Sequence, residues 1–208
     1  LLFSILVFYI KFFYIINQIK YNPYNLHTMI DTLASSNSTT VWLSFFTALC
    51  IIEAFLLTTF RLFPNFWGSM INVWYDKFGL VAIMLDMLIV LIGFWITQKV
   101  YTYFFGDSIK LSLWKFIVLF LVVQIIHDVL FYVLILKNSK GSNSILDLIN
   151  SYGAKHGIYT IVGDSLMVVL AICLAWLLLT KDVSFSTHII CILLSFYFIG
   201  YVLYMKWN

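Results

Sequence analysis

The sequence predicts an all-α protein that is a polytopic bundle of transmembrane helices. Of its 208 residues 63% are hydrophobic and only 10% are charged, and the mean hydropathy is +1.01. A soluble domain could not bury so much apolar surface, whereas a membrane protein exposes it to lipid. The apolar residues also gather in runs of about 20, the length that crosses a bilayer as a helix.

Five apolar runs are long enough to be membrane spans. They lie at residues 41–60, 79–104, 113–136, 158–179 and 187–205. A sixth run, at 1–19, has Lys11 in its middle. Residues 1–28 are therefore either a leading helix or sequence upstream of a start at Met29, and both interpretations stay open. We expect residues 29–208 to form a single transmembrane domain.

A pattern recurs 78 positions apart, between residues 72–90 and residues 150–168. Matches of Ile, Leu and Val carry little weight in so apolar a chain, but Asn, Lys, Gly and Asp are uncommon here. The matching residues are Asn72, Lys77, Gly79, Ile83, Asp86, Leu88 and Val90 in the first copy, and Asn150, Lys155, Gly157, Ile161, Asp164, Leu166 and Val168 in the second. The sequence thus indicates an internal duplication.

Each copy of the repeat is preceded by a short amphipathic segment, at residues 65–76 and 143–154. Their apolar faces carry tryptophan or tyrosine, which is typical of helices that lie in the membrane interface. Gly79 and Gly157 stand where each interfacial helix must turn into the bilayer, and glycine makes a sharp turn easy.

The repeating unit is therefore predicted to be a span, an interfacial helix and a second span. It occurs at about residues 41–104 and again at about 113–179, and the span at 187–205 stands outside it. Because two spans separate equivalent positions, both units point the same way across the membrane. The orientation of the whole stays open, because the basic residues divide almost equally between the two sides.

Four acidic residues lie inside the first four spans, where a charge is costly and usually has a purpose. They are Glu53, Asp86, Asp128 and Asp164. At a helical rise of about 1.5 Å per residue, all four fall at one depth, about 10 to 13 Å below one membrane surface. His127 adjoins Asp128, but neighbours on a helix are predicted to point apart, so His127 could instead pair with an acid from another span.

These polar residues have two interpretations. Acids gathered at one depth can bind protons or a monovalent cation, or they can form hydrogen bonds that fix the pairing of helices. A transport path needs polar groups on both sides of the midplane. We expect the other half of each span to be plain hydrocarbon, which favours the second interpretation.

Other functional classes find little support in the sequence. Cys50, Cys173 and Cys191 lie far apart inside apolar spans and resemble small hydrophobic residues. His27 and His188 stand alone, so no metal site, catalytic residue or cofactor is predicted, and the protein is not expected to be an enzyme. A net charge of +3 is too small to indicate binding to nucleic acid.

Three motifs carry a resemblance to a known family. The run N-V-W-Y-D-K-F-G-L at 72–80, the run I-H-D-V-L-F-Y at 126–132 and the segment G-D-S-L-M at 163–167 resemble an uncharacterised family of polytopic membrane proteins encoded by large double-stranded DNA viruses of algae and protists. The resemblance covers about residues 41–180. It implies a protein of a virion's internal membrane or of a host membrane, with no known activity.

The sequence therefore predicts a structural or assembly component of a viral membrane. On this hypothesis the polar residues within the spans lock the bundle, and the interfacial helices present a surface to capsid or other membrane proteins. The alternative is a small channel or carrier for protons or monovalent cations, with Asp86 and Asp164 as paired sites. Five spans could also form a pore as a homo-oligomer, and the oligomeric state stays open.

Overall fold

The computed structural model describes residues 33–67, 69–105 and 112–205, and it does not describe the side chains of residues 69, 152 and 154–160. Residues 1–28, for which the sequence left two interpretations, lie outside the described part. The described chain is helical without a strand, which confirms the all-α class. Its helices are α3 (Thr39–Leu62), α4 (Pro64–Trp67), α5 (Ser69–Phe78), α6 (Leu80–Phe105), α7 (Leu113–Leu136), α8 (Ser144–Thr180) and α9 (Phe185–Tyr204).

Five helical segments in the described residues are long and apolar enough to cross a membrane. They are α3, α6, α7, residues 161–180 of α8, and α9. Each lies within three residues of a predicted span at both ends, so the five predicted spans are confirmed as helices. Such a set of helices fits a multi-pass membrane protein.

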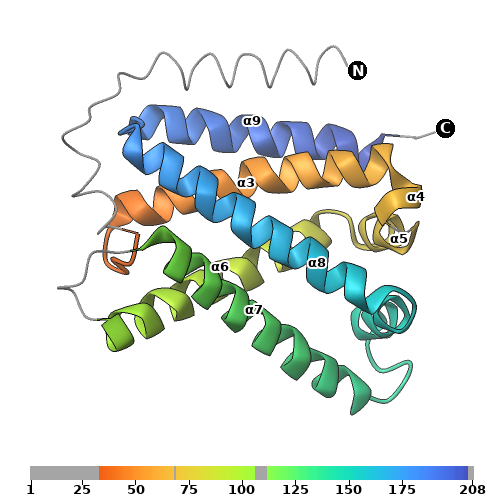
Figure 1. The fold of residues 1–208 in the computed structure, drawn as a ribbon. Helices are drawn as coiled ribbons and strands as arrows, with labels where there is room; N and C mark the ends of the chain where they lie inside the picture. The colour runs from red at the N-terminus through yellow and green to blue at the C-terminus, as the bar shows by residue number, and fades with distance from the viewer. Residues whose placement is uncertain (1–32, 68, 106–111, 206–208) are drawn as a thin grey trace.

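Helix α3 forms the centre of the bundle, between α8 and α9 on one side and α6 on the other (Figure 1). Two thirds of its apolar window, 67%, is buried, against 17% for α7 at the periphery. Helix α7 packs against α6 and α8 and leaves a broad row of large apolar side chains exposed. That row has the character of a surface that faces lipid.

Stacked aromatic rings join α3, α6 and α7. The rings of Phe45 and Phe94 lie parallel with centroids 3.8 Å apart, and Phe116 and Phe120 of α7 lie 5.8 and 6.2 Å from Phe94. Gly93 makes this packing possible, because a Cβ atom there would lie 2.8 Å from the ring of Phe120. Small residues at such crossings are how membrane helices approach one another closely.

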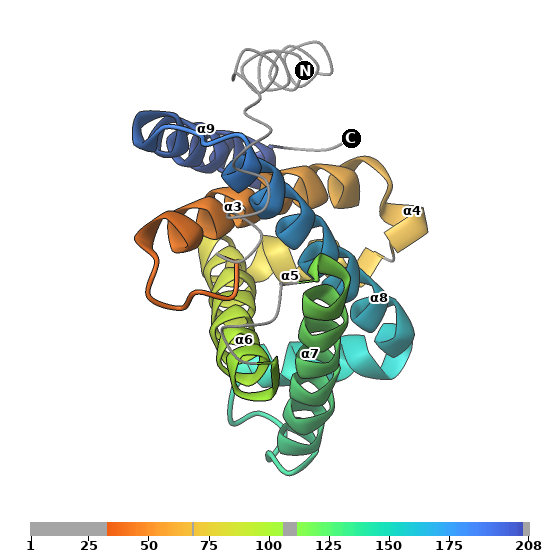
Figure 2. The same ribbon diagram turned by 60° about the vertical axis from the view of Figure 1, so that its left-hand side comes forward.

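The two copies of the repeat differ in structure. In the first, α5 ends at a turn in which Gly79 has φ of 55°, and α6 then begins. In the second, α8 runs unbroken from Ser144 through Gly157 to Thr180, so the predicted duplication of a span, an interfacial helix and a second span is not confirmed. Figure 2 shows that the first turns of α8 lie across the rest of the helix. A bent helix keeps its backbone hydrogen-bonded, which apolar surroundings demand.

The order of the helices defines two sides of the bundle. The side with α5, which we call the α5 side, also holds the loop at 137–143 and the end of α9 (Figure 1). The opposite side holds the start of α3 and the turn at 181–184 between α8 and α9. Loops that lie on different sides should differ in their access to reagents added outside a sealed membrane.

This topology can be tested with single cysteines at two exposed positions, after the three native cysteines are replaced by alanine. Asn138→Cys lies on the α5 side and Ser186→Cys on the opposite side, and both residues are exposed. A thiol reagent that cannot cross the membrane should label only one of the two in intact cells, and both after the membrane is opened. Labelling of both in intact cells would contradict the topology.

The contact at Gly93 gives a second prediction. Gly93→Ala should lower the free energy of unfolding by about 1–3 kcal/mol, because the Phe120 ring must move out of a packed position. Gly163→Ala is the matched control, since nothing lies within 4 Å of a Cβ atom built there. Unfolding in mixed detergent micelles measures both variants, and an equal effect of the two would contradict the packing described for α6 and α7.

Candidate functional site

Helix α5 carries an aromatic pair into the bundle, where it contacts two of the acids. The Tyr75 hydroxyl lies 3.3 Å from Oε1 of Glu53 on α3 and 3.4 Å from Oδ2 of Asp86 on α6. The indole nitrogen of Trp74 donates to the same Oδ2 at 3.2 Å. Glu53 and Tyr75 are 1% and 3% exposed. We call these four residues the Tyr75 cluster.

The turn at Gly79 positions this cluster. The left-handed backbone at Gly79 reverses the chain. Tyr75, four positions before the turn, therefore lies beside Asp86, seven positions after it. The hydroxyl of Tyr204 lies 3.2 Å from the place where a Cβ atom of residue 79 would be. The backbone conformation therefore favours glycine at this position, and a Cβ atom there would also displace the Tyr204 hydroxyl.

Polar contacts at the membrane surface hold α5 in place. Arg61 at the end of α3 forms an ion pair with Asp76 of α5, with Nη2 and Oδ1 2.6 Å apart, and donates to the Leu203 carbonyl at 3.2 Å. Asn72 of α5 donates to the carbonyl of Phe60 at 3.0 Å, one of the last carbonyls of α3, which lack a partner within the helix. The ends of α3 and α9 are thus tied to α5.

Tyr75 is a neutral hydrogen-bond donor in this arrangement. Burial raises the pKa of its hydroxyl well above the ordinary value, and the nearby acidic groups of Glu53, Asp86 and Asp164 act in the same direction. The hydroxyl therefore keeps its hydrogen at physiological pH.

The other two predicted acids lie close by on α7 and α8. Asp164 is within electrostatic range of Asp86 and Asp128, and Glu53 is within range of Asp164. The four acids thus form one group that is contributed by four helices. Among the described residues, Glu53 and Asp86 share a hydrogen-bonding group, the Tyr75 hydroxyl.

The prediction for His127 is wrong. Its Nδ1 lies 3.1 Å from Oδ1 of the adjacent Asp128, and Gln124, one turn earlier, donates to the same oxygen at 2.9 Å. Nδ1 lies close to the backbone and reaches the neighbouring side chain, while the Phe131 ring stacks on the imidazole with centroids 5.7 Å apart. His127 therefore binds an acid of its own helix.

The expectation that the other half of the spans is plain hydrocarbon is also wrong. His188 of α9 is 1% exposed and lies against Ser44 and Thr47 of α3, both fully buried. Its Nδ1 is 2.9 Å from the Thr47 hydroxyl and its Nε2 is 3.4 Å from the Ser44 hydroxyl. Because Thr47 already donates to the Leu43 carbonyl, Nδ1 must be the protonated nitrogen, and Nε2 accepts from Ser44. A second buried polar group thus joins α3 and α9.

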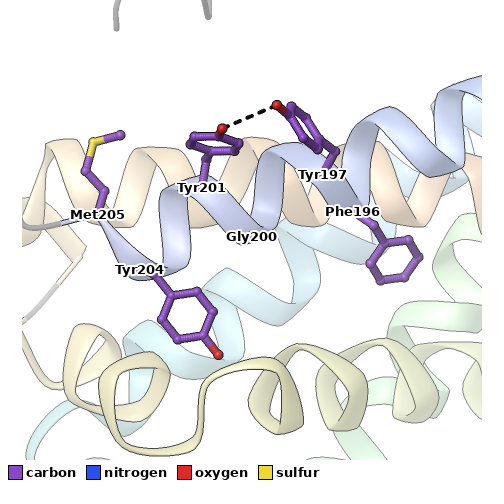
Figure 3. A pocket seen from close by; sticks show the side chains of 6 residues that line it. All are labelled: Phe196, Tyr197, Gly200, Tyr201, Tyr204 and Met205. Atoms are coloured by element: carbon purple, nitrogen blue, oxygen red, sulfur yellow. Dashed lines mark hydrogen bonds between the residues drawn. The ribbon is translucent and has the colours of Figure 1, made fainter.

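The described residues include no group of three or more His, Cys, Asp or Glu side chains that could hold a metal ion. Cys50 and Cys191 are buried free thiols, and Cys173 is an exposed one. An open cavity of about 560 Å³ lies along α9, where none of the acids lines it (Figure 3). Its lining residues are Phe196, Tyr197, Gly200, Tyr201, Tyr204 and Met205.

Comparisons of the chain with protein-family models, with curated proteins and with solved structures found no match.

The hydroxyl of Tyr75 should contribute measurably to stability. Tyr75→Phe keeps the ring that packs against Phe60 but removes the hydroxyl that lies between the carboxyl groups of Glu53 and Asp86, so the free energy of unfolding should fall by about 1–3 kcal/mol. Tyr103→Phe is the matched control, because Tyr103 is 84% exposed on α6. Unfolding in mixed micelles measures both, and no difference between the variants would contradict a structural role of the hydroxyl.

Proposed function

We propose that this chain is an integral membrane protein with a structural or assembly role and no catalytic activity. The observation that carries the proposal is the position of the Tyr75 hydroxyl, within hydrogen-bond distance of carboxyl groups from two different spans. Buried polar groups that bind one another across helices fix how those helices pair. The Tyr75 cluster therefore acts as a lock between α3, α5 and α6.

The assembly role concerns the α5 side of the bundle. Helix α5 and the start of α8 lie there, and both expose polar side chains, among them Asp76, Lys77, Asn150 and Ser151. On this proposal they form the surface that meets capsid or other membrane proteins. The resemblance of residues 41–180 to proteins of large DNA viruses is what supports a virion or host membrane as the location.

The proposal includes a duplicated origin for the two units at 41–104 and 113–179. The recurrence of Asn, Lys, Gly and Asp at a constant spacing supports it. The position equivalent to Tyr75 is Gly153, so the second unit has no hydroxyl to form such a lock. On this account the lock developed in the first unit alone, and the second unit kept a continuous helix.

A second candidate function is a channel or carrier for protons or monovalent cations. Two observations favour it: the four acids of four spans lie near one another, and the polar group around His188 lies in the other half of the bundle. Asp86 and Asp164 would then be the paired sites of the repeat.

Measurements of proton and sodium flux distinguish the two functions. Liposomes with the purified wild-type chain should show no flux above protein-free liposomes, and the Asp86→Asn, Asp164→Asn double mutant should show none either. Circular dichroism confirms that both proteins are helical. A wild-type flux that disappears in a helical double mutant would overturn the structural proposal and establish the transport function.

A further inference from the structure

The Tyr75 hydroxyl has a single hydrogen but two carboxyl oxygens within reach. These contacts, at 3.3 Å to Glu53 and 3.4 Å to Asp86, are almost equal in length. If both carboxyl groups were ionised, the hydroxyl could donate to only one of them. The other anion would face a tyrosine lone pair inside the bilayer, at a high electrostatic cost. One of the two carboxyl groups must therefore carry a proton of its own.

The surroundings show which carboxyl group carries it. Asp86 accepts from the Trp74 indole at 3.2 Å and can also accept from Tyr75, and two such donors stabilise a carboxylate. Glu53 is 1% exposed, and its hydrogen-bond partner among the described residues is Tyr75. An ionised Glu53 would be a buried charge with at most one neutral donor, which is the more costly arrangement.

We propose that Glu53, Tyr75 and Asp86 form a proton-binding site in which Glu53 holds the proton. The protonated Glu53 donates to the Tyr75 oxygen, and Tyr75 donates to the ionised Asp86. This inference rests on the proposed lock and adds its chemistry: the lock is a directed chain of hydrogen bonds that exists only while one proton is bound. The ligand of the site is thus a proton rather than a metal ion.

The chain of hydrogen bonds also defines a path for that proton. When the Glu53 O–H bond breaks, its proton passes to the Tyr75 oxygen, while the Tyr75 hydrogen passes to Oδ2 of Asp86. Two O–H bonds break and two form, so the net change is the transfer of one proton without any electron, and the step leaves Glu53 ionised and Asp86 neutral. Trp74 opposes this step because its donor favours an ionised Asp86.

Other titratable groups lie around the site on each neighbouring helix. The Cys50 thiol on α3 is within electrostatic range of Glu53, as is Asp164 on α8, and Asp128 on α7 is within range of Asp164. None of them is a cation, so any that is ionised adds repulsion against a second negative charge in the cluster.

Glu53 is the sole glutamate of the sequence, which makes the test specific. Protein made by cell-free synthesis with ¹³C-labelled glutamate contains one labelled side-chain carboxyl group, and solid-state NMR in lipid vesicles at pH 7 reports its protonation. The expected signal is that of a neutral carboxylic acid. A carboxylate signal would overturn the proposal.

Two variants sharpen this test. In Asp86→Asn the anion that accepts the Tyr75 hydrogen is gone, so Tyr75 can donate to the protonated Glu53 instead of accepting from it, and the labelled signal should stay that of a neutral acid but change its chemical shift. Asp147→Asn is the control, because Asp147 binds the backbone of Gly141 outside the spans, and it should leave the signal unchanged. An unchanged signal in Asp86→Asn would contradict the proposed chain.

Failure of this inference differs from failure of the lock. An ionised Glu53 in a protein that Tyr75→Phe still destabilises would overturn the proton site and leave the lock in place. A neutral Glu53 in a protein that Tyr75→Phe leaves fully stable would support the proton site and overturn the lock.

Discussion

The structure depends on one hydroxyl group, that of Tyr75, which lies between the carboxyl groups of two spans. A bilayer gives unpaired polar groups no alternative partner, so each acid in a span must find a donor within the protein or carry a proton. Helix α5 supplies that donor by folding back into the bundle beside α3 and α6. The two acids therefore need the donor on α5, and their contacts with Tyr75 hold α5 beside α3 and α6.

Two polar connections fix the central helix at different depths. The Tyr75 cluster binds α3 on the α5 side, and His188 binds it to α9 nearer the opposite side. Apolar and aromatic packing also holds the helices together, as where the rings of Phe45 and Phe94 stack. Packing between membrane helices is weakly specific, because lipid is as apolar as the side chains. The polar contacts therefore determine which helices are neighbours.

Much of this fold could be predicted because a span has a fixed length and an apolar composition. Counting residues along helices predicted a common depth for the four acids, and Glu53 and Asp86 do lie at one hydroxyl. The role of Tyr75 could not be predicted, because it depends on how far the chain reverses at Gly79. The partners of His188 lie more than 140 residues away along the chain. The prediction for His127 was wrong because it considered only the directions in which neighbouring residues leave a helix. The side-chain rotamer of His127 lets its ring reach the adjacent Asp128.

The hydrogen bond between the Tyr75 hydroxyl and the Glu53 carboxyl group is the contact on which the proposed stabilisation of the bundle depends most directly. A double-mutant cycle with Tyr75→Phe and Glu53→Leu measures that coupling directly, from the free energies of unfolding of the wild type, both single variants and the double variant in mixed micelles. We expect a coupling energy of about 1 kcal/mol or more, as found for residues that share a hydrogen bond. Losses of stability that simply add, with no coupling beyond error, would contradict the account.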